Sequence, residues 1–149
     1  MTTILAPCPR CGTTNRIPAV KQHLSPRCGR CHTGLDLRSQ AVPVPLDDSD
    51  FAAFVAAAPL PVLVELYSPT CGPCHTLAPV IAVLARRYFG RLIVAKVDVS
   101  RARATAARFD VRGVPTLVFL AGGRVVDEVA GAVSEAALAD WVERQLARR

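Results

Sequence analysis

The residues best suited to chemistry are six cysteines, which form three Cys-x-x-Cys pairs at Cys8/Cys11, Cys28/Cys31 and Cys71/Cys74. In a secreted chain such pairs suggest structural disulfides, whereas in a reducing compartment they are more often metal-binding or redox-catalytic. The segment 1–10 has no basic stretch followed by an apolar core, so it does not resemble a secretory signal. We therefore expect a cytoplasmic protein whose cysteines bind metal or carry out redox chemistry.

The third pair lies where a thiol becomes reactive. Cys71-Gly72-Pro73-Cys74 follows a predicted strand directly and opens a predicted helix. The unpaired N–H groups and the positive dipole end of a helix N-terminus stabilise a thiolate. We expect Cys71, nearer the loop, to attack a substrate disulfide and Cys74 to resolve the mixed disulfide. A half zinc site or an inert pair of core thiols is the alternative.

The first two pairs have the spacing of a structural zinc site. Sixteen residues separate Cys8-x-x-Cys11 from Cys28-x-x-Cys31, and two such pairs supply the four thiolates of one tetrahedral zinc ion. Two disulfides or two further redox pairs are the alternatives. His23 and His32 could replace a ligand, but four cysteines already complete the shell. The sequence therefore favours one structural zinc ion.

The remaining sequence predicts the elements that position these cysteines. Periodicity indicates helices over 47–58, 73–89 and 101–109 and a last helix capped by Ser134, and strands over 61–67, 92–99, 116–120 and 124–129. Gly122-Gly123 between the last two strands is typical of a hairpin. With an extended stretch near residue 42, the order β-α-β-α-β-α-β-β-α predicts an α/β fold with helices on both faces of a mixed sheet.

A composition break near Pro43 and Pro45 divides the chain. We expect a four-cysteine zinc-binding module over 1–38, a linker and the start of the first strand over 39–46, and one larger domain over 47–149. The first segment has few large apolar residues, and a piece of about 40 residues generally needs a metal, a disulfide or a partner to stay folded.

The net charge of +6 comes mostly from this first segment. Residues 1–40 hold six Lys or Arg against one acid, whereas the rest hold twelve against eleven. Four zinc-bound thiolates would lower the first segment's excess, so a mildly basic, solvated face is favoured over a nucleic-acid patch. No stretch has the roughly 18 uninterrupted apolar residues of a membrane span. We therefore expect neither a membrane nor a nucleic acid as a partner.

The reactive pair and its surroundings resemble the thioredoxin family. The similarity runs through Cys71-Gly72-Pro73-Cys74 after Val62–Tyr67, then Val94–Val99, Val111–Thr116 and Gly131-Ala132, and covers about residues 42–149. It implies the thioredoxin fold and a reductase of protein disulfides that acts through a mixed disulfide. It also implies re-reduction by a thioredoxin reductase, with no cofactor at the catalytic site. With its N-terminal cysteines, the chain is similar to the zinc-containing thioredoxin 2 type, which suggests that thiolate oxidation ejects zinc and alters activity.

The resemblance also implies residue roles. Pro115 matches the cis-proline that faces the active-site cysteines, and the backbone beside it, at Val114, would pair with an extended substrate stretch. Gly131 matches a glycine that permits close substrate approach, and Gly72 and Pro73 would border the same surface.

Two ionisable residues match the family's acid–base pair. Glu65 stands in place of a buried aspartate beneath the second cysteine, where desolvation would raise its pKa and let it take a proton from Cys74. Lys96 matches a nearby lysine. Alternatively, Glu65 and Lys96 merely pair at a strand end.

The chain departs from the family pattern beside the active site. Thr70 and Tyr67 stand where tryptophans are common, and His75 where Lys or Arg is frequent. His75 could tune the thiolate as a cation, but an exposed bystander is the favoured interpretation, and Trp141 is expected to pack in the core. Two other functions stay open. One is an oxidant or isomerase of disulfides, and the other is a zinc-ribbon module that binds nucleic acid or protein with the larger domain as a scaffold.

Overall fold

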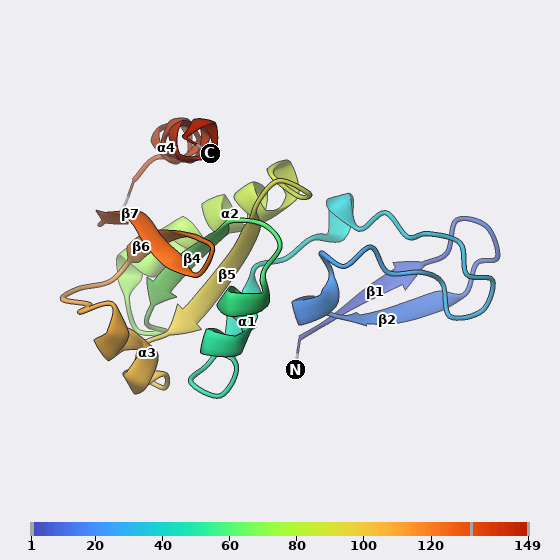
Figure 1. The fold of residues 1–149 in the computed structure, drawn as a ribbon, viewed down its shortest axis with the longest axis horizontal. Helices are drawn as coiled ribbons and strands as arrows, with labels where there is room; N and C mark the ends of the chain where they lie inside the picture. The colour runs from blue at the N-terminus through green and yellow to red at the C-terminus, as the bar shows by residue number, and fades with distance from the viewer. Residues whose placement is uncertain (1, 132, 149) are drawn as a thin grey trace.

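The computed structural model describes residues 2–131 and 133–148; Ala132, part of the family resemblance, lies outside them. Its main unit is a five-stranded sheet in the order β3-β5-β4-β6-β7 (Figure 1). The strands are β3 (Val44–Leu46), β4 (Val62–Tyr67), β5 (Ile93–Asp98), β6 (Thr116–Ala121) and β7 (Arg124–Ala130). β3 and β4 each pair in parallel with β5, whereas β6 is antiparallel to β4 and β7. The sheet is mixed, as the sequence predicted.

Four helices alternate with these strands and cover both faces. They are α1 (Phe51–Ala57), α2 (Gly72–Arg87), α3 (Arg103–Arg108) and α4 (Glu135–Ala147). On β4, Val64 packs in a buried cluster with α1 residues, whereas Leu63 packs in a second cluster with residues of α2 and α4. Successive strand side chains point to opposite faces, so β4 is buried on both sides and α2 lies on the face that Leu63 shares.

The last strands and helix follow the predicted pattern closely. Gly122 and Gly123 have φ of 60° and 77°, the left-handed values that a tight two-residue hairpin turn requires. Ser134 caps α4, because its Oγ accepts a hydrogen bond from Ala137 N–H at 3.2 Å. Trp141 is buried and packs edge-on against Phe119, as expected for a core residue.

The first helix begins later than the sequence predicted. A helix from residue 47 is wrong: residues 47–50 form a turn, and α1 starts at Phe51. Asp50 Oδ1 accepts from Asp47 N–H at 2.8 Å and closes that turn. Asp48 instead accepts from Thr105 N–H at 2.8 Å and so engages the first turn of α3. Asp50 thus closes a turn and Asp48 caps α3. Because these side chains are used in this way, α1 begins only at Phe51.

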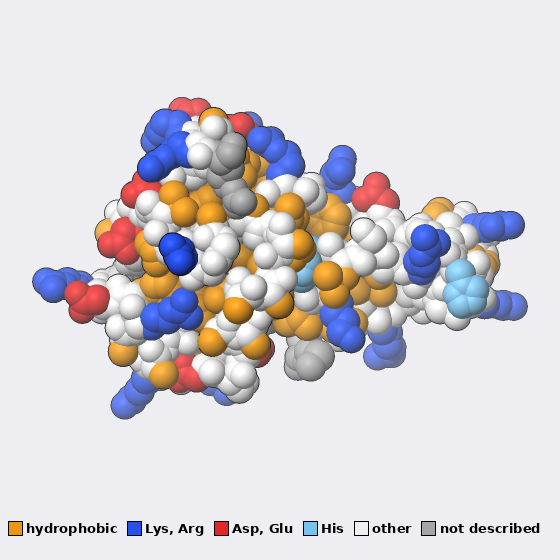
Figure 2. Space-filling view, in the orientation of Figure 1, with side chains coloured by type: hydrophobic (Ala, Val, Ile, Leu, Met, Phe, Trp, Pro, Cys, Tyr) orange, Lys and Arg blue, Asp and Glu red, His pale blue; other side chains and the backbone are white. Residues whose placement is uncertain are grey.

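The N-terminal cysteines belong to a separate small unit, here called the ribbon unit, over residues 2–37. It contains the hairpin β1 (Thr3–Pro7) and β2 (Thr14–Pro18), then one turn of 3-10 helix, η1 (Ala19–Lys21); a second, η2 (Arg38–Gln40), follows the unit. It projects to one side of the main sheet as a narrow lobe, with basic side chains at its far end (Figure 2).

Apolar contacts join the ribbon unit to the main unit. Val20 packs against the buried cluster of α1 and β3, and Phe89, just after α2, packs against the small core of the ribbon unit. Gln22 is buried and bonds to both backbone groups of Val42, donating to its carbonyl at 2.8 Å and accepting from its N–H at 3.1 Å. The two units therefore share side chains across their junction. Within the described residues, no helix is long and apolar enough to cross a membrane.

Candidate active site and metal centre

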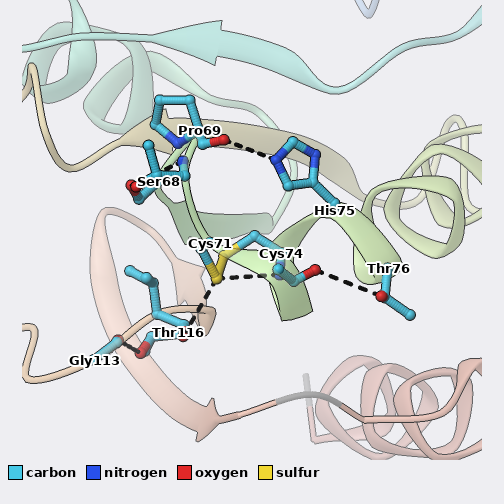
Figure 3. Close-up of a disulfide and its surroundings, with 11 residues drawn as sticks. Ser68, Pro69, Cys71, Cys74, His75, Thr76, Gly113 and Thr116 are labelled. Atoms are coloured by element: carbon cyan, nitrogen blue, oxygen red, sulfur yellow. Dashed lines mark hydrogen bonds between the residues drawn. A yellow bond between two sulfur atoms is a disulfide. The ribbon is translucent and has the colours of Figure 1, made fainter.

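Cys71 and Cys74 lie at the start of α2 and are joined by a disulfide (Figure 3). Cys71 is the N-cap of α2, and its Sγ accepts a hydrogen bond from Cys74 N–H at 3.1 Å. Pro73 lies within the first two helical positions, where its missing N–H has no intrahelical partner to lose. Cys71 is partly exposed, whereas Cys74 is only 4% exposed. The Cys71 sulfur can therefore react with a partner from solution, whereas the Cys74 sulfur is buried.

The loop between α3 and β6 faces the first cysteine. The Val114–Pro115 peptide bond is cis, as the resemblance implied, and Val114 O lies 3.7 Å from Cys71 Sγ. Gly131 N–H donates to Pro115 O at 2.9 Å and so holds the end of β7 beside this loop. Gly131 has a φ of 90°, and apart from its own chain neighbours no atom of the described residues lies within 4 Å of where its Cβ would be. The structure thus brings Val114, Pro115 and Gly131 together next to Cys71, with Gly72 and Pro73 exposed at the start of α2.

A buried acid lies on the same face of the sheet as α2. Glu65 is two residues after Leu63 on β4, so it shares the face that packs against α2, and it is only 4% exposed. Desolvation raises its pKa from 4.5 to about 7, and Lys96 acts in the opposite direction. Its Oε2 has no hydrogen-bond partner among the residues that the structure describes.

Lys96 lies beside this acid on the next strand. The two residues are register partners in the β4–β5 pair. No ion pair joins them within the described part of the chain, and Lys96 Nζ instead lies 5.7 Å from the centre of the Tyr67 ring. Glu65 is therefore a desolvated carboxyl with free capacity to accept a proton.

The loop before Cys71 is held by polar contacts. Cys71 N–H donates to Ser68 O at 3.2 Å, and the hydroxyls of Ser68 and Thr70 lie 3.1 Å apart. His75 is exposed, but its Nε2 lies 2.7 Å from Pro69 O. Sequence reasoning considered His75 only as a cation or a bystander and missed this contact.

The other four cysteines converge at the far end of the ribbon unit. The sulfurs of Cys8, Cys11, Cys28 and Cys31 all lie within 4.8 Å of one another, and none of the four forms a disulfide. Four sulfur donors at this spacing suit a tetrahedral zinc ion. The neighbouring histidines are absent from the cluster: His23 packs edge-on against Phe54, and His32 is exposed.

The two halves of this cluster repeat each other. Gly12 N–H donates to Cys8 O, and His32 N–H donates to Cys28 O; both residues have positive φ. Each second cysteine also has its Sγ close to a threonine hydroxyl, Thr13 or Thr33. The sequence signal was the repeated Cys-x-x-Cys-x-Thr, which the spacing of cysteines alone did not reveal.

Backbone N–H groups favour the thiolate of Cys28, whereas burial and the neighbouring thiols raise the pKa of Cys8. Arg10 N–H and Arg30 N–H each point to a sulfur, at 3.4 Å from Cys8 Sγ and Cys28 Sγ. N–H groups of Cys31 and Arg30 lower the pKa of the Cys28 thiol to about 6. The backbone N–H groups of Arg10 and Arg30 therefore make direct contacts with the sulfurs of the cluster.

Comparison with known proteins matches one family model to each part of the chain. The family model "Thioredoxin" matches residues 42–144, and the model "Thioredoxin 2, N-terminal", a zinc ribbon, matches residues 7–33. The chain is 34% identical to thioredoxin C-3 of Corynebacterium nephridii over 139 residues, which cover 93% of each chain. It is 35% identical to a thioredoxin of Haemophilus influenzae over 68% of this chain and 94% of that one.

A solved structure shows the same fold. A mutant thioredoxin from Halobacterium salinarum superposes with a TM-score of 0.63 at 38% identity, covering 69% of this chain and 89% of the other.

Proposed function

Because this chain belongs to the thioredoxin family of thiol–disulfide oxidoreductases, we propose that it reduces disulfides of cytoplasmic proteins through Cys71 and Cys74. The observation that carries this proposal is the pair at the start of α2, with Cys71 partly exposed, Cys74 buried and the Val114–Pro115 loop facing Cys71. The cytoplasmic location is proposed because free zinc-binding thiols and a reducing dithiol both need a reducing compartment.

The first step is attack on the substrate by Cys71. Its thiolate, stabilised by Cys74 N–H and the helix N-terminus, attacks one sulfur of the substrate disulfide. A bond forms between Cys71 Sγ and that sulfur while the substrate S–S bond breaks. The second substrate sulfur leaves as a thiolate and takes a proton. The Val114 backbone, whose carbonyl oxygen lies 3.7 Å from Cys71 Sγ, and the open space at Gly131 would accommodate an extended substrate segment.

The second step releases the substrate. Cys74 loses its proton and attacks Cys71 Sγ, so the Cys71–Cys74 disulfide forms and the remaining substrate sulfur leaves as a thiolate that is then protonated. Glu65, with its pKa near neutrality and a free oxygen on this face of the sheet, is the proposed acceptor of the Cys74 proton. Lys96 modulates that carboxyl by its positive charge. The substrate gains two electrons and two protons in total.

The dithiol must then be regenerated. A thioredoxin reductase would return two electrons to the Cys71–Cys74 disulfide, so no bound cofactor is needed at this site. The cluster of Cys8, Cys11, Cys28 and Cys31 would hold one zinc ion with all four positions filled by protein. Such a closed shell stabilises the ribbon unit and leaves no position for a substrate.

A reductase-coupled assay tests this function. NADPH, a thioredoxin reductase and a protein disulfide such as insulin are combined with the wild type, Cys71→Ser or Cys74→Ser, each loaded with zinc. The wild type should consume NADPH in proportion to the disulfide reduced, and both variants should lose turnover. Full activity in either variant would contradict the mechanism. A protein that binds partners normally without Cys71 would instead support the alternative of a binding module.

A further inference from the structure

The turn that carries Cys71 has little apolar support. Residues 68–71 connect β4 to α2, and Pro69 and Thr70 are exposed. The contacts within the turn are polar: Cys71 N–H to Ser68 O at 3.2 Å, and Thr70 N–H to Ser68 Oγ at 3.4 Å. Hydrogen bonds in contact with water are individually weak. One additional hydrogen bond, here called the tie, therefore changes the fraction of time that the turn keeps this conformation.

His75 supplies such a tie from the helix. Its backbone is fixed in the first turn of α2, where its N–H donates to Cys71 O at 3.2 Å. Its Nε2 lies 2.7 Å from Pro69 O. A carbonyl oxygen can only accept, so Nε2 carries the proton, and both the neutral Nε2–H tautomer and the imidazolium can donate. The side chain therefore connects the turn before Cys71 to the helix after it.

The tie lies on the side of the disulfide away from the substrate surface. Figure 3 shows His75 and Pro69 on one side of the Cys71–Cys74 disulfide, and Gly113 and Thr116, which flank Val114 and Pro115, on the other. His75 can therefore brace Cys71 without occupying the space between Cys71 and the Val114–Pro115 loop.

We propose that His75 is a positioning residue for thiol–disulfide exchange, which holds the 68–71 turn through Pro69 O and keeps Cys71 in its N-cap geometry. This proposal rests on the proposed function. In that geometry Cys74 N–H points to Cys71 Sγ at 3.1 Å. When the turn loosens, Cys71 spends less time there, and the fraction of molecules ready to attack falls. The role belongs to the hydrogen bond, so an uncharged donor of similar reach can replace the imidazole.

The test compares His75→Ala, which removes the donor, with His75→Gln, which offers an amide N–H on a chain of similar length. Thr76→Ala is the matched control, because Thr76 is the next exposed residue of α2 and contacts Gly72 O instead of the turn. Each reduced protein is mixed with a small aromatic disulfide that releases a coloured thiolate, and the second-order rate is measured. Insulin reduction and thermal unfolding are measured in parallel.

His75→Ala should react roughly three- to tenfold more slowly, the factor expected from one hydrogen bond in partial contact with water. His75→Gln should recover to within about twofold of the wild type, and Thr76→Ala should match it. A wild-type rate in His75→Ala would overturn the proposal. So would an equal loss in His75→Gln, or a fall in unfolding temperature large enough to explain the slower reaction.

The two proposals can fail separately. The small disulfide requires neither a protein substrate nor a reductase. If the wild type fails to reduce insulin while His75→Ala still slows the small-disulfide reaction, the proposed function fails and the positioning role stands. If the wild type and His75→Ala reduce insulin equally and their small-disulfide rates are equal, the positioning role of His75 fails and the proposed function stands.

Discussion

At the scale of single residues, Glu65 is a buried carboxyl that we propose as the acid–base group of the site. Glu65 has a pKa near 7 because burial penalises its charged form more than Lys96 stabilises it. An acid with this pKa can accept a proton from a neighbouring thiol near neutral pH and return it afterwards. The same burial makes Glu65 unfavourable for the folded state once it ionises.

We expect the free-energy cost of ionising the buried Glu65 to appear in the pH dependence of stability. The pKa of Glu65 is raised in the folded state, so its stabilising contribution is complete below the unfolded value of 4.5 and is lost as the pH rises through about 7. The wild type should lose on the order of 3 kcal/mol of unfolding free energy over this range relative to Glu65→Gln. Denaturant unfolding of both oxidised proteins at about pH 5 and about pH 8 measures the difference. Parallel pH profiles would show that Glu65 is not desolvated.

Residue roles were predictable where they depend on local context. The position of Cys71 and Cys74 between a strand and a helix separated them from the other cysteines, whereas the raised pKa of Glu65 was expected from the resemblance, which places it where the family has a buried aspartate. The contact between His75 and Pro69 O was not predictable, because it depends on the path of a loop that contains no periodic pattern. Val114 and Gly131 lie together at Pro115 because β6 pairs with β7. Only the family resemblance predicted that these residues share one surface.

At the scale of elements, a single carboxylate joins two helices that are distant in the sequence. Asp48 precedes α1, yet it accepts from Ala104 N–H at 3.1 Å and from both Thr105 N–H and Thr105 Oγ1 at 2.8 Å. It thereby caps α3, whose own preceding residue, Ala102, has no side-chain acceptor. The sequence placed Asp48 in its local helix because acids favour helix N-termini; nothing local shows that α3 competes for it.

Replacing this carboxylate should loosen α3. The hydrogen bonds from Thr105 lower the pKa of Asp48, so its contribution is present above the unfolded pKa and is lost as the pH falls through the lowered value. Asp48→Ala should lower the thermal midpoint by a few degrees at neutral pH, and Asp48→Asn, which keeps an acceptor, by less. The exposed Asp140→Ala is the control. An unchanged midpoint in Asp48→Ala would show that another group caps α3.

At the scale of the whole molecule, the ribbon unit and the main unit are packed together. Val20 extends from the ribbon unit onto the main core, and Phe89 extends from the end of α2 onto the ribbon core. The division into domains expected from Pro43 and Pro45 stays a prediction. The order of elements was predictable from periodicity. The packing at this junction was not predictable, because in the sequence Val20 and Phe89 resemble ordinary core residues of their own units.

The shared packing predicts that metal removal reaches beyond the ribbon unit. Chelation of zinc, or Cys11→Ser, should disorder the ribbon core, expose Phe89 and lower the unfolding temperature of the main unit. Metal content and thermal unfolding followed by the fluorescence of Trp141, which lies in the main unit, measure both effects. Phe89→Ala should make the Trp141 transition less sensitive to chelation. A Trp141 transition that is unchanged by chelation in the wild type would show that the two units unfold independently.

The most direct test of the account is to trap the mixed disulfide. Reduced, zinc-loaded Cys74→Ser is incubated with a disulfide-containing protein, and the products are digested and mapped by mass spectrometry. We expect a covalent one-to-one adduct through Cys71, reversed by dithiothreitol, and none in Cys71→Ser. An adduct carried mainly by Cys8, Cys11, Cys28 or Cys31, or an equal adduct through Cys74 in Cys71→Ser, would contradict it.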